Sequence, residues 1–142
     1  GRITMAGPNT SPMTLFNVAG RAMSAQLVRM NAAASNLANA GTVSSSESTA
    51  YRPLRPVFSE ELDRSTGLAT VKVNGVYRSS ATPIKDHQPD NPLADQNGDV
   101  WSAPVDESAE MVEMLESSRQ YQNVVEAMQT AKQLMLDTMR MK

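Results

Sequence analysis

The sequence predicts a mainly α-helical fold, in which a long helix at each end of the chain flanks a small β-rich insertion. Apolar residues alternate three and four apart in both terminal segments, whereas prolines and the candidate strands gather in the middle. This spacing is typical of helices that pair along a seam, as in a coiled coil. We therefore expect residues 11–41 and 104–142 to form one discontinuous helical core, with residues 42–103 inserted between them.

Residues 11–41 are predicted to form the first helix. Ser11 can cap its N-terminus, and Pro12 suits the first helical position, where the missing N–H is no loss. Gly41 is placed to end the helix in the left-handed conformation. One face carries a seam of apolar and small residues that we expect to pack against other helices, namely Phe16, Gly20, Met23, Leu27, Met30, Ala34 and Leu37.

Residues 42–103 have a different character. The Ser-rich stretch at residues 44–49 is expected to be flexible, and the prolines that follow rule out a long helix. The Asn-Gly pairs at residues 74–75 and 97–98 are hairpin signals. We expect short strands at residues 57–58, 70–73 and 75–78.

The last segment, from Asp106 to Lys142, contains no Gly or Pro and is predicted to form a second, longer helix. One row of residues should pack against a partner helix; its apolar members and Tyr121 are Met111, Met114, Tyr121, Val125, Met128, Met135 and Met139. A second row lies beside it, formed by Val124, Ala127, Ala131, Leu134, Thr138 and Met141. A single partner helix covers only one row, so the other is predicted to bind further partners.

The charges of the two helical segments are complementary. Residues 14–41 carry Arg21 and Arg29 and no carboxylate, whereas the second helix begins with a run of acidic residues. Such charges can set the register of helices within one subunit or between subunits. From the pattern alone, an ordinary monomeric helical hairpin with a solvated acidic face remains an alternative.

Composition excludes several functional classes. The net charge of −2 provides no basic field for nucleic acid, and the lack of cysteine excludes disulfides, thiol nucleophiles and thiolate metal sites. His87 is the only histidine and is expected to be an exposed loop residue. Asp95 to Gly98 is expected to form a turn rather than a calcium loop, because the ligand positions before and after it lack carboxylates. We expect no enzymatic activity, cofactor or metal.

No apolar run approaches the ~20 residues that span a bilayer. Residues 1–12 also lack the continuous apolar stretch of a cleavable secretory signal. We expect no direct membrane insertion, and export by another route if the protein works outside the cytoplasm. Residues 1–10 are interpreted as an N-terminal extension or an expression remnant.

Three short motifs carry a family resemblance. The run Ser35, Asn36, Leu37, Ala38, Asn39 closes the Ala-rich helix and resembles the signature of the flagellar rod, hook and hook-associated axial proteins. The loop Asn91, Pro92, Leu93, Ala94, Asp95 and the helical residues Ser118, Arg119, Tyr121, Gln122 are similar to those of rod members of that family. One departure is that Tyr51 is displaced by the Ser-rich insert, and no Gly precedes it.

The resemblance implies a structural subunit of the proximal rod of the bacterial flagellar basal body. Its terminal helices would form a tube that transmits torque across the periplasm, with the insertion outside. It would be exported by the flagellar type III apparatus without a cleavable signal peptide. Its partners would be other rod proteins, copies of itself, the basal-body base and the distal rod. Another axial rod protein, or a helical binding or adaptor module of a secretion system, are the alternatives.

Asn36 and Asn39 are further expected to bond to backbone groups where the first helix ends, as Asn does readily.

Overall fold

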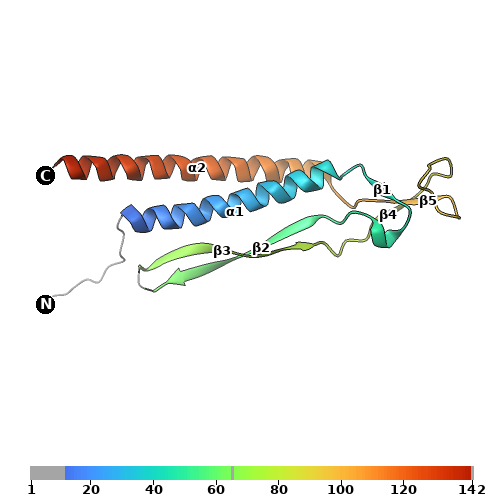
Figure 1. Cartoon of the computed structure of the whole chain (residues 1–142), viewed down its shortest axis with the longest axis horizontal. Coiled ribbons are helices and arrows are strands. Elements are labelled where there is room, and N and C mark those ends of the chain that lie inside the picture. Colours follow the sequence, from blue (N-terminus) through green and yellow to red (C-terminus); the bar gives the residue numbers. More distant parts are fainter. Residues whose placement is uncertain (1–11, 65, 142) are drawn as a thin grey trace.

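The computed structural model describes residues 12–64 and 66–141, so the predicted cap Ser11 and the extension at residues 1–10 lie outside the described residues. Two long helices, α1 (Pro12–Ala38) and α2 (Glu107–Arg140), lie side by side and run in opposite directions (Figure 1). The predicted order of helix, β-rich insertion and helix is confirmed. The insertion contains β1 (Val43–Ser44), a short 3-10 helix (Glu47–Thr49), β2 (Leu54–Asp63), β3 (Leu68–Arg78), β4 (Ile84–His87) and β5 (Asp99–Ser102).

The strands form two separate antiparallel sheets. The hairpin of β2 and β3 lies along α1 on the side opposite α2, so α1 is the middle layer of three (Figure 1). The second sheet has the strand order β1-β5-β4 and lies beyond the end of α1, far from the C-terminal end of α2. The molecule is therefore an elongated block with the helices and hairpin at one end and a small sheet at the other.

The predicted hairpin turn at residues 74–75 is wrong. Strand β3 runs straight through this pair: Val57 is opposite Gly75 and Phe58 is opposite Val73, so Asn74 is the extra residue of a β-bulge. A turn at residues 74–75 would have left the backbone of β2 without a partner strand, whereas the longer hairpin pairs all of it. The chain reverses instead between Asp63 and Leu68, where Gly67 has a φ of 71° and its N–H donates to the Asp63 carbonyl over 2.7 Å.

The second Asn-Gly pair does lie in a turn, within a loop longer than a two-residue hairpin. Strands β4 and β5 are joined by residues 88–98, and the Gly98 N–H donates to the Asp95 carbonyl over 3.0 Å. Gly98 has a φ of 79°, and a Cβ added there would lie 2.9 Å from Cε1 of His87. A glycine is therefore required both by the backbone conformation and by the close approach of the histidine ring.

The helix ending predicted at Gly41 is also wrong. Helix α1 ends at Ala38, and Gly41 is not among the described glycines with positive φ. Asn39 ends the helix instead, because its side-chain Nδ2 donates to the Ser35 carbonyl over 2.9 Å. Thr42 Oγ1 then donates to the Asn39 carbonyl over 2.7 Å. The expected role of Asn39 is confirmed, and side-chain hydrogen bonds replace a left-handed glycine.

Asn36 fastens the hairpin to α1. The residue is 0% exposed; its Nδ2 donates to the Leu54 carbonyl over 3.1 Å, and its Oδ1 accepts from the Leu54 N–H over 2.8 Å. Tyr51 Oη also donates to Oδ1 over 2.7 Å and lies 2.9 Å from Ser35 Oγ. A side-chain amide offers a donor and an acceptor together, so it can satisfy both backbone groups of one residue. The expected bonding of Asn36 to backbone is confirmed, but its partner is the start of β2.

Small side chains allow α1 to approach its neighbours closely. The buried apolar residues of α1 are Ala25, Ala32 and Ala33, and Ser117 is fully buried on α2. Ser117 Oγ donates to the Glu113 carbonyl in the preceding turn over 2.7 Å, so its hydroxyl is satisfied within α2. Between α1 and α2, the core is therefore thin and contains few large side chains.

Two ion pairs fix the position of α2. Arg29 Nε lies 2.6 Å from Oε1 of Glu113, and this hydrogen bond raises the pKa of Arg29. Arg55 of β2 lies 2.5 Å from Oε1 of Glu110, whose side chain is buried. Of the two arginines predicted to set the register, Arg29 therefore meets the acidic start of α2 within one subunit, whereas Arg21 donates to Thr70 of the hairpin.

An ionic cluster closes the distal sheet. Asp99 is buried on β5; its Oδ1 lies 3.0 Å from Nδ1 of His87, and its Oδ2 lies 3.4 Å from Nζ of Lys85. The hydrogen bond with His87 and the charge of Lys85 lower the pKa of Asp99. His87 is exposed as predicted, but it is the last residue of β4 rather than a loop residue.

Replacing Asn36 with Ala should reduce the free energy of unfolding by about 2 kcal/mol, because the half-buried N–H and C=O of Leu54 lose the hydrogen bonds of this buried side chain. Chemical denaturation measures this loss. Asn31→Ala, an exposed position on the same helix, is the control and should change stability by less than about 0.5 kcal/mol. Equal effects of the two changes would contradict the assigned role of Asn36.

The distal sheet should open in acid. A folded-state pKa below the ordinary value means that the ionised Asp99 stabilises the fold fully above about pH 4, and that this stabilisation is lost as the pH falls through the lower folded-state pKa. Hydrogen exchange of β4 and β5 should therefore accelerate in that range. Asp99→Asn should remove most of this pH dependence, whereas Asp90→Asn in the adjoining loop should retain it. An unchanged acid profile in Asp99→Asn would contradict the assignment.

Candidate assembly surface

Apolar recesses follow the seam between the start of α1 and the second half of α2. On one side of α1 a recess of about 430 Å³ is lined almost entirely by apolar side chains. Its walls include Leu15, Val18 and Ala22 from α1 and Val124, Ala127 and Ala131 from α2. The second apolar row predicted on α2 therefore borders a recess that α1 leaves open.

A matching recess lies on the other side of α1. It measures about 290 Å³ and is lined by Phe16, Met23, Val125, Met128, Gln129 and Lys132. Residues Val125 and Met128 belong to the first row predicted on α2. Helix α1 thus lies between the two rows and fills neither side completely.

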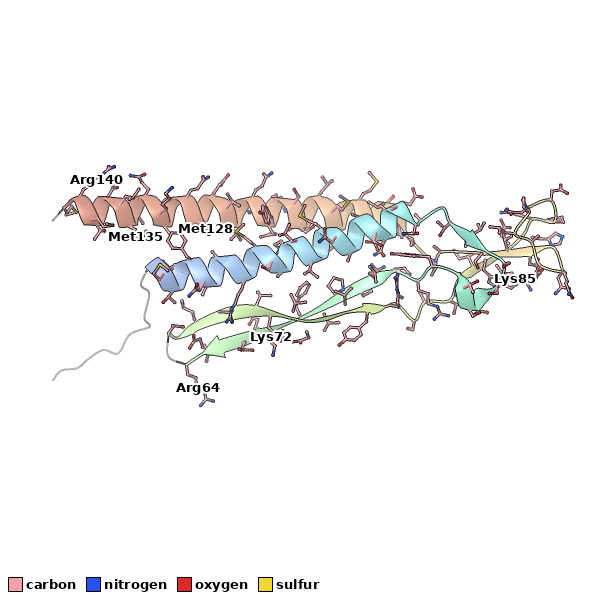
Figure 2. The ribbon with its side chains drawn as sticks, in the orientation of Figure 1. Arg64, Lys72, Lys85, Met128, Met135 and Arg140 are labelled. Carbon is pink, nitrogen blue, oxygen red and sulfur yellow. The ribbon has the colours of Figure 1, made fainter. Side chains whose placement is uncertain are left out.

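The C-terminal turns of α2 extend past the start of α1 (Figure 1). A third recess, of about 480 Å³, lies there between Leu15 and residues 127–139 of α2. Figure 2 shows Met128 and Met135 on the side of α2 that faces α1, while Arg140 points away. Apolar surface therefore continues along α2 beyond its partner helix in the subunit.

The predicted packing residues fall into two groups in the isolated subunit. One group is exposed and leaves surface free for other molecules, namely Leu27, Ala34, Met111 and Met139. The others are half-buried, namely Phe16, Met23, Met30, Leu37, Met114, Tyr121, Val125, Met128 and Met135. The most deeply buried positions of α1, which include Ala32 and Ala33, were not among the predicted packing residues. Ala25, Ala32 and Asn36 follow each other at spacings of seven and four residues, which places them on one face of the helix. This spacing was the signal that could have indicated the buried positions.

The motif residues have separate structural roles. Ser35, Asn36 and Asn39 gather at the end of α1, whereas the loop motif lies at the opposite end of the molecule from the recesses (Figure 1). In that loop, Asn91 Oδ1 accepts from the Leu93 N–H, and Asp95 Oδ1 accepts from two further backbone N–H groups, all over 2.9 Å. These hydrogen bonds fix the conformation of the loop, in which Pro92 and Leu93 are exposed. Asp95 lies in the predicted turn.

The motif on α2 lies on its flank. Ser118 and Tyr121 are half-buried, whereas Gln122 is exposed. Arg119 lies 2.5 Å from Oε2 of Glu116, and hydrogen bonds from Gln120 and Arg119 lower the pKa of Glu116. The motif therefore stabilises the local helix surface through an ion pair.

Within residues 12–64 and 66–141, no three His, Asp or Glu side chains are grouped so as to hold a metal ion. No helix in this part of the chain is both long and apolar enough to cross a bilayer. The main surface feature of the described residues is the apolar surface along the seam between α1 and α2.

Comparison with known proteins identifies the family. Residues 16–43 match the family described as flagella basal body rod protein, and residues 96–141 match the C-terminal region of flagellar basal body rod FlgEFG proteins. The flagellar basal-body rod protein FlgC of Salmonella typhimurium is 43% identical over 129 residues, which cover 89% of this chain and 95% of the relative. FlgC of Escherichia coli O157:H7 is 42% identical with the same coverage, and that of Yersinia enterocolitica is 39% identical over 91% and 96%.

The two family matches contain most of α1 and all of α2, which are the elements that border the recesses. The resemblance found in the three motifs is confirmed over most of the chain. The chain therefore belongs to the FlgC family of flagellar basal-body rod proteins and is a structural subunit of the basal-body rod.

Proposed function

We propose that α1 and α2 of this subunit enter a helical tube, in which they form coiled-coil contacts with the helices of neighbouring subunits in the proximal rod. The observation that carries this proposal is the position of α1 between two apolar rows of α2, with an open recess on each side. A neighbouring helix placed in either recess would cover apolar surface that the isolated subunit leaves in water.

The dimensions of the helices support a role in a tube wall. At a rise of 1.5 Å per residue, the 27 residues of α1 and the 34 of α2 give lengths of about 40 Å and 50 Å. Helices of this length gain most of their stability from tertiary or quaternary contacts. Since the core between α1 and its neighbours is thin, contacts along the recesses would add substantially to the stability of the assembled subunit.

The hairpin is placed to lie outside such a tube. It covers the face of α1 opposite α2, and it is linked to α1 by Asn36 and to α2 by the pair of Arg55 and Glu110. These links would make the helices and the hairpin move as one body. Torque applied to the helices would then pass through the subunit without its layers sliding apart.

The role in the cell is mechanical rather than catalytic. We infer that the subunit occupies the periplasmic section of the rod, between the basal-body base and the distal rod, and arrives through the flagellar type III export apparatus. Its neighbours would be other rod proteins and copies of itself. Support comes from the names of its relatives, which are flagellar basal-body rod proteins.

One alternative remains distinct from this proposal, in which the chain occupies another position among the axial rod proteins. Electron microscopy of basal bodies with the subunit labelled separates the two: density at the proximal rod supports the proposal, and density elsewhere in the rod contradicts it.

Ala127→Asp should abolish assembly without unfolding the subunit. Ala127 is exposed and borders two recesses, so the new carboxylate is solvated in the isolated chain but is buried once a neighbouring helix is seated. We expect loss of swimming, with a circular dichroism spectrum and thermal midpoint close to those of the unsubstituted protein. Val125→Asp, on the opposite side of α1, should have the same effect on swimming.

The matched control is Gln122→Asp, an exposed position on α2 that borders none of these recesses. It adds the same charge and should leave swimming intact. Normal motility of the Ala127→Asp strain would show that the recess is not an interface.

A further inference from the structure

The chain contains two Asn-Gly pairs, at residues 74–75 and 97–98, and the fold places them in different surroundings. Asparagine is a chemically labile residue. When glycine follows it, no side chain hinders attack of the glycine nitrogen on the asparagine amide. The product of this attack is a cyclic succinimide, which water opens to aspartate or isoaspartate. The fold decides how readily each pair can react.

Asn74 is exposed and lies in the β-bulge of β3, in the hairpin that forms an outer layer of the molecule (Figure 1). It is the residue of the bulge that has no partner on β2, so regular strand pairing is interrupted at this pair. The next residue, Gly75, has a φ of 153°, which glycine adopts more readily than other residues. The attacking residue therefore carries no side chain, and the asparagine is accessible to water.

Two hydroxyl groups donate hydrogen bonds to Asn74. Ser59 Oγ, on β2, donates to the side-chain Oδ1 over 3.3 Å. Tyr77 Oη donates to the backbone carbonyl over 3.4 Å. The Tyr77 ring also lies against Gly75, where an added Cβ would be 2.8 Å from Oη. The two donors thus reach the amide that is attacked and the peptide group that supplies the attacking nitrogen.

These hydrogen bonds lie where negative charge develops during ring closure. The Gly75 nitrogen must lose its proton, and the resulting charge is shared with the backbone oxygen that accepts from Tyr77. Attack on Cγ of Asn74 then places negative charge on Oδ1, beside the Ser59 hydroxyl. A donor placed where charge develops lowers the barrier of a reaction. Both steps are therefore favoured at this pair.

The second pair is held in a conformation that opposes the reaction. The Gly98 N–H donates to the Asp95 carbonyl over 3.0 Å, so its nitrogen must leave this hydrogen bond before it can attack. A Cβ added at Gly98 would lie 2.9 Å from the His87 ring and 3.2 Å from Pro89, so the turn has little room to rearrange. The fold therefore protects Asn97.

We propose that Asn74 is a site of spontaneous deamidation, whereas Asn97 is retained. The Gly75 nitrogen forms a bond to Cγ of Asn74, and its proton passes through water to the side-chain nitrogen. The C–N bond of the side-chain amide breaks, and ammonia leaves. Water then adds to one carbonyl of the succinimide, which yields aspartate or isoaspartate without an oxidant or an enzyme. The product adds a negative charge to the hairpin at the bulge, where β3 already contains an extra residue.

Peptide mapping by mass spectrometry tests this proposal on the folded, full-length protein in mildly alkaline buffer. Asn74 should convert about tenfold faster than Asn97, because the first pair has two donors and the second has a bound nitrogen. In denaturant the two pairs should convert at similar rates, since neither is then held by the fold.

Variants of the two donors test the mechanism, with Asn97 as the control within each sample. Ser59→Ala and Tyr77→Phe should each slow conversion of Asn74 about fivefold, as expected for one lost hydrogen bond, and leave Asn97 unchanged. Ser59→Thr retains the hydroxyl and should keep the rate of the unsubstituted protein.

Equal conversion of the two pairs in the folded protein, or faster conversion of Asn97, would overturn the proposal. Unchanged conversion of Asn74 in both donor variants would overturn the role of the hydroxyl groups. A rise at both pairs in either variant would mean that opening of the fold controls the reaction, and would also contradict the proposal. None of these outcomes depends on assembly of the rod.

Discussion

The side-chain amide of Asn36 holds both backbone groups of Leu54, and the path of the hairpin depends on that contact. Because β2 begins at Leu54, the contact determines where the strand starts against α1. Tyr51 and Ser35 complete the site, and burial of Asn36 makes each hydrogen bond costly to lose. One polar residue in a thin core of alanines therefore sets the order of the three layers.

That order determines which surfaces remain for other subunits. The hairpin covers one face of α1 and α2 covers the opposite face, so the apolar recesses lie on the two flanks of the α1–α2 seam and along the turns of α2 that extend past α1. The ion pairs of Arg29 with Glu113 and Arg55 with Glu110 neutralise two of the carboxylates near the start of α2.

Both helices and the family could be predicted because their signals are repeated over many residues or several motifs. Local signals were less reliable. The Asn-Gly pair at residues 74–75 indicates a turn, but pairing along the whole of β2 and β3 overrides it. The apolar rows of α2 were identified from spacing, whereas the burial of Ala32 and Ala33 depends on where the hairpin lies. The complementary charges could be predicted from sequence, but their partners, such as Glu113 for Arg29, required the structure.

The alanine-rich interior has a consequence for how the subunit responds to load. An alanine buries little apolar area, so each closely packed turn of α1 contributes only a small part of the free energy of folding. Close approach of the backbones nevertheless limits lateral displacement of the layers, since few large side chains separate them. The isolated subunit should thus be only marginally stable and yet geometrically well defined. Stiffness would then belong to the completed polymer, and a single subunit would yield readily when its neighbours are absent.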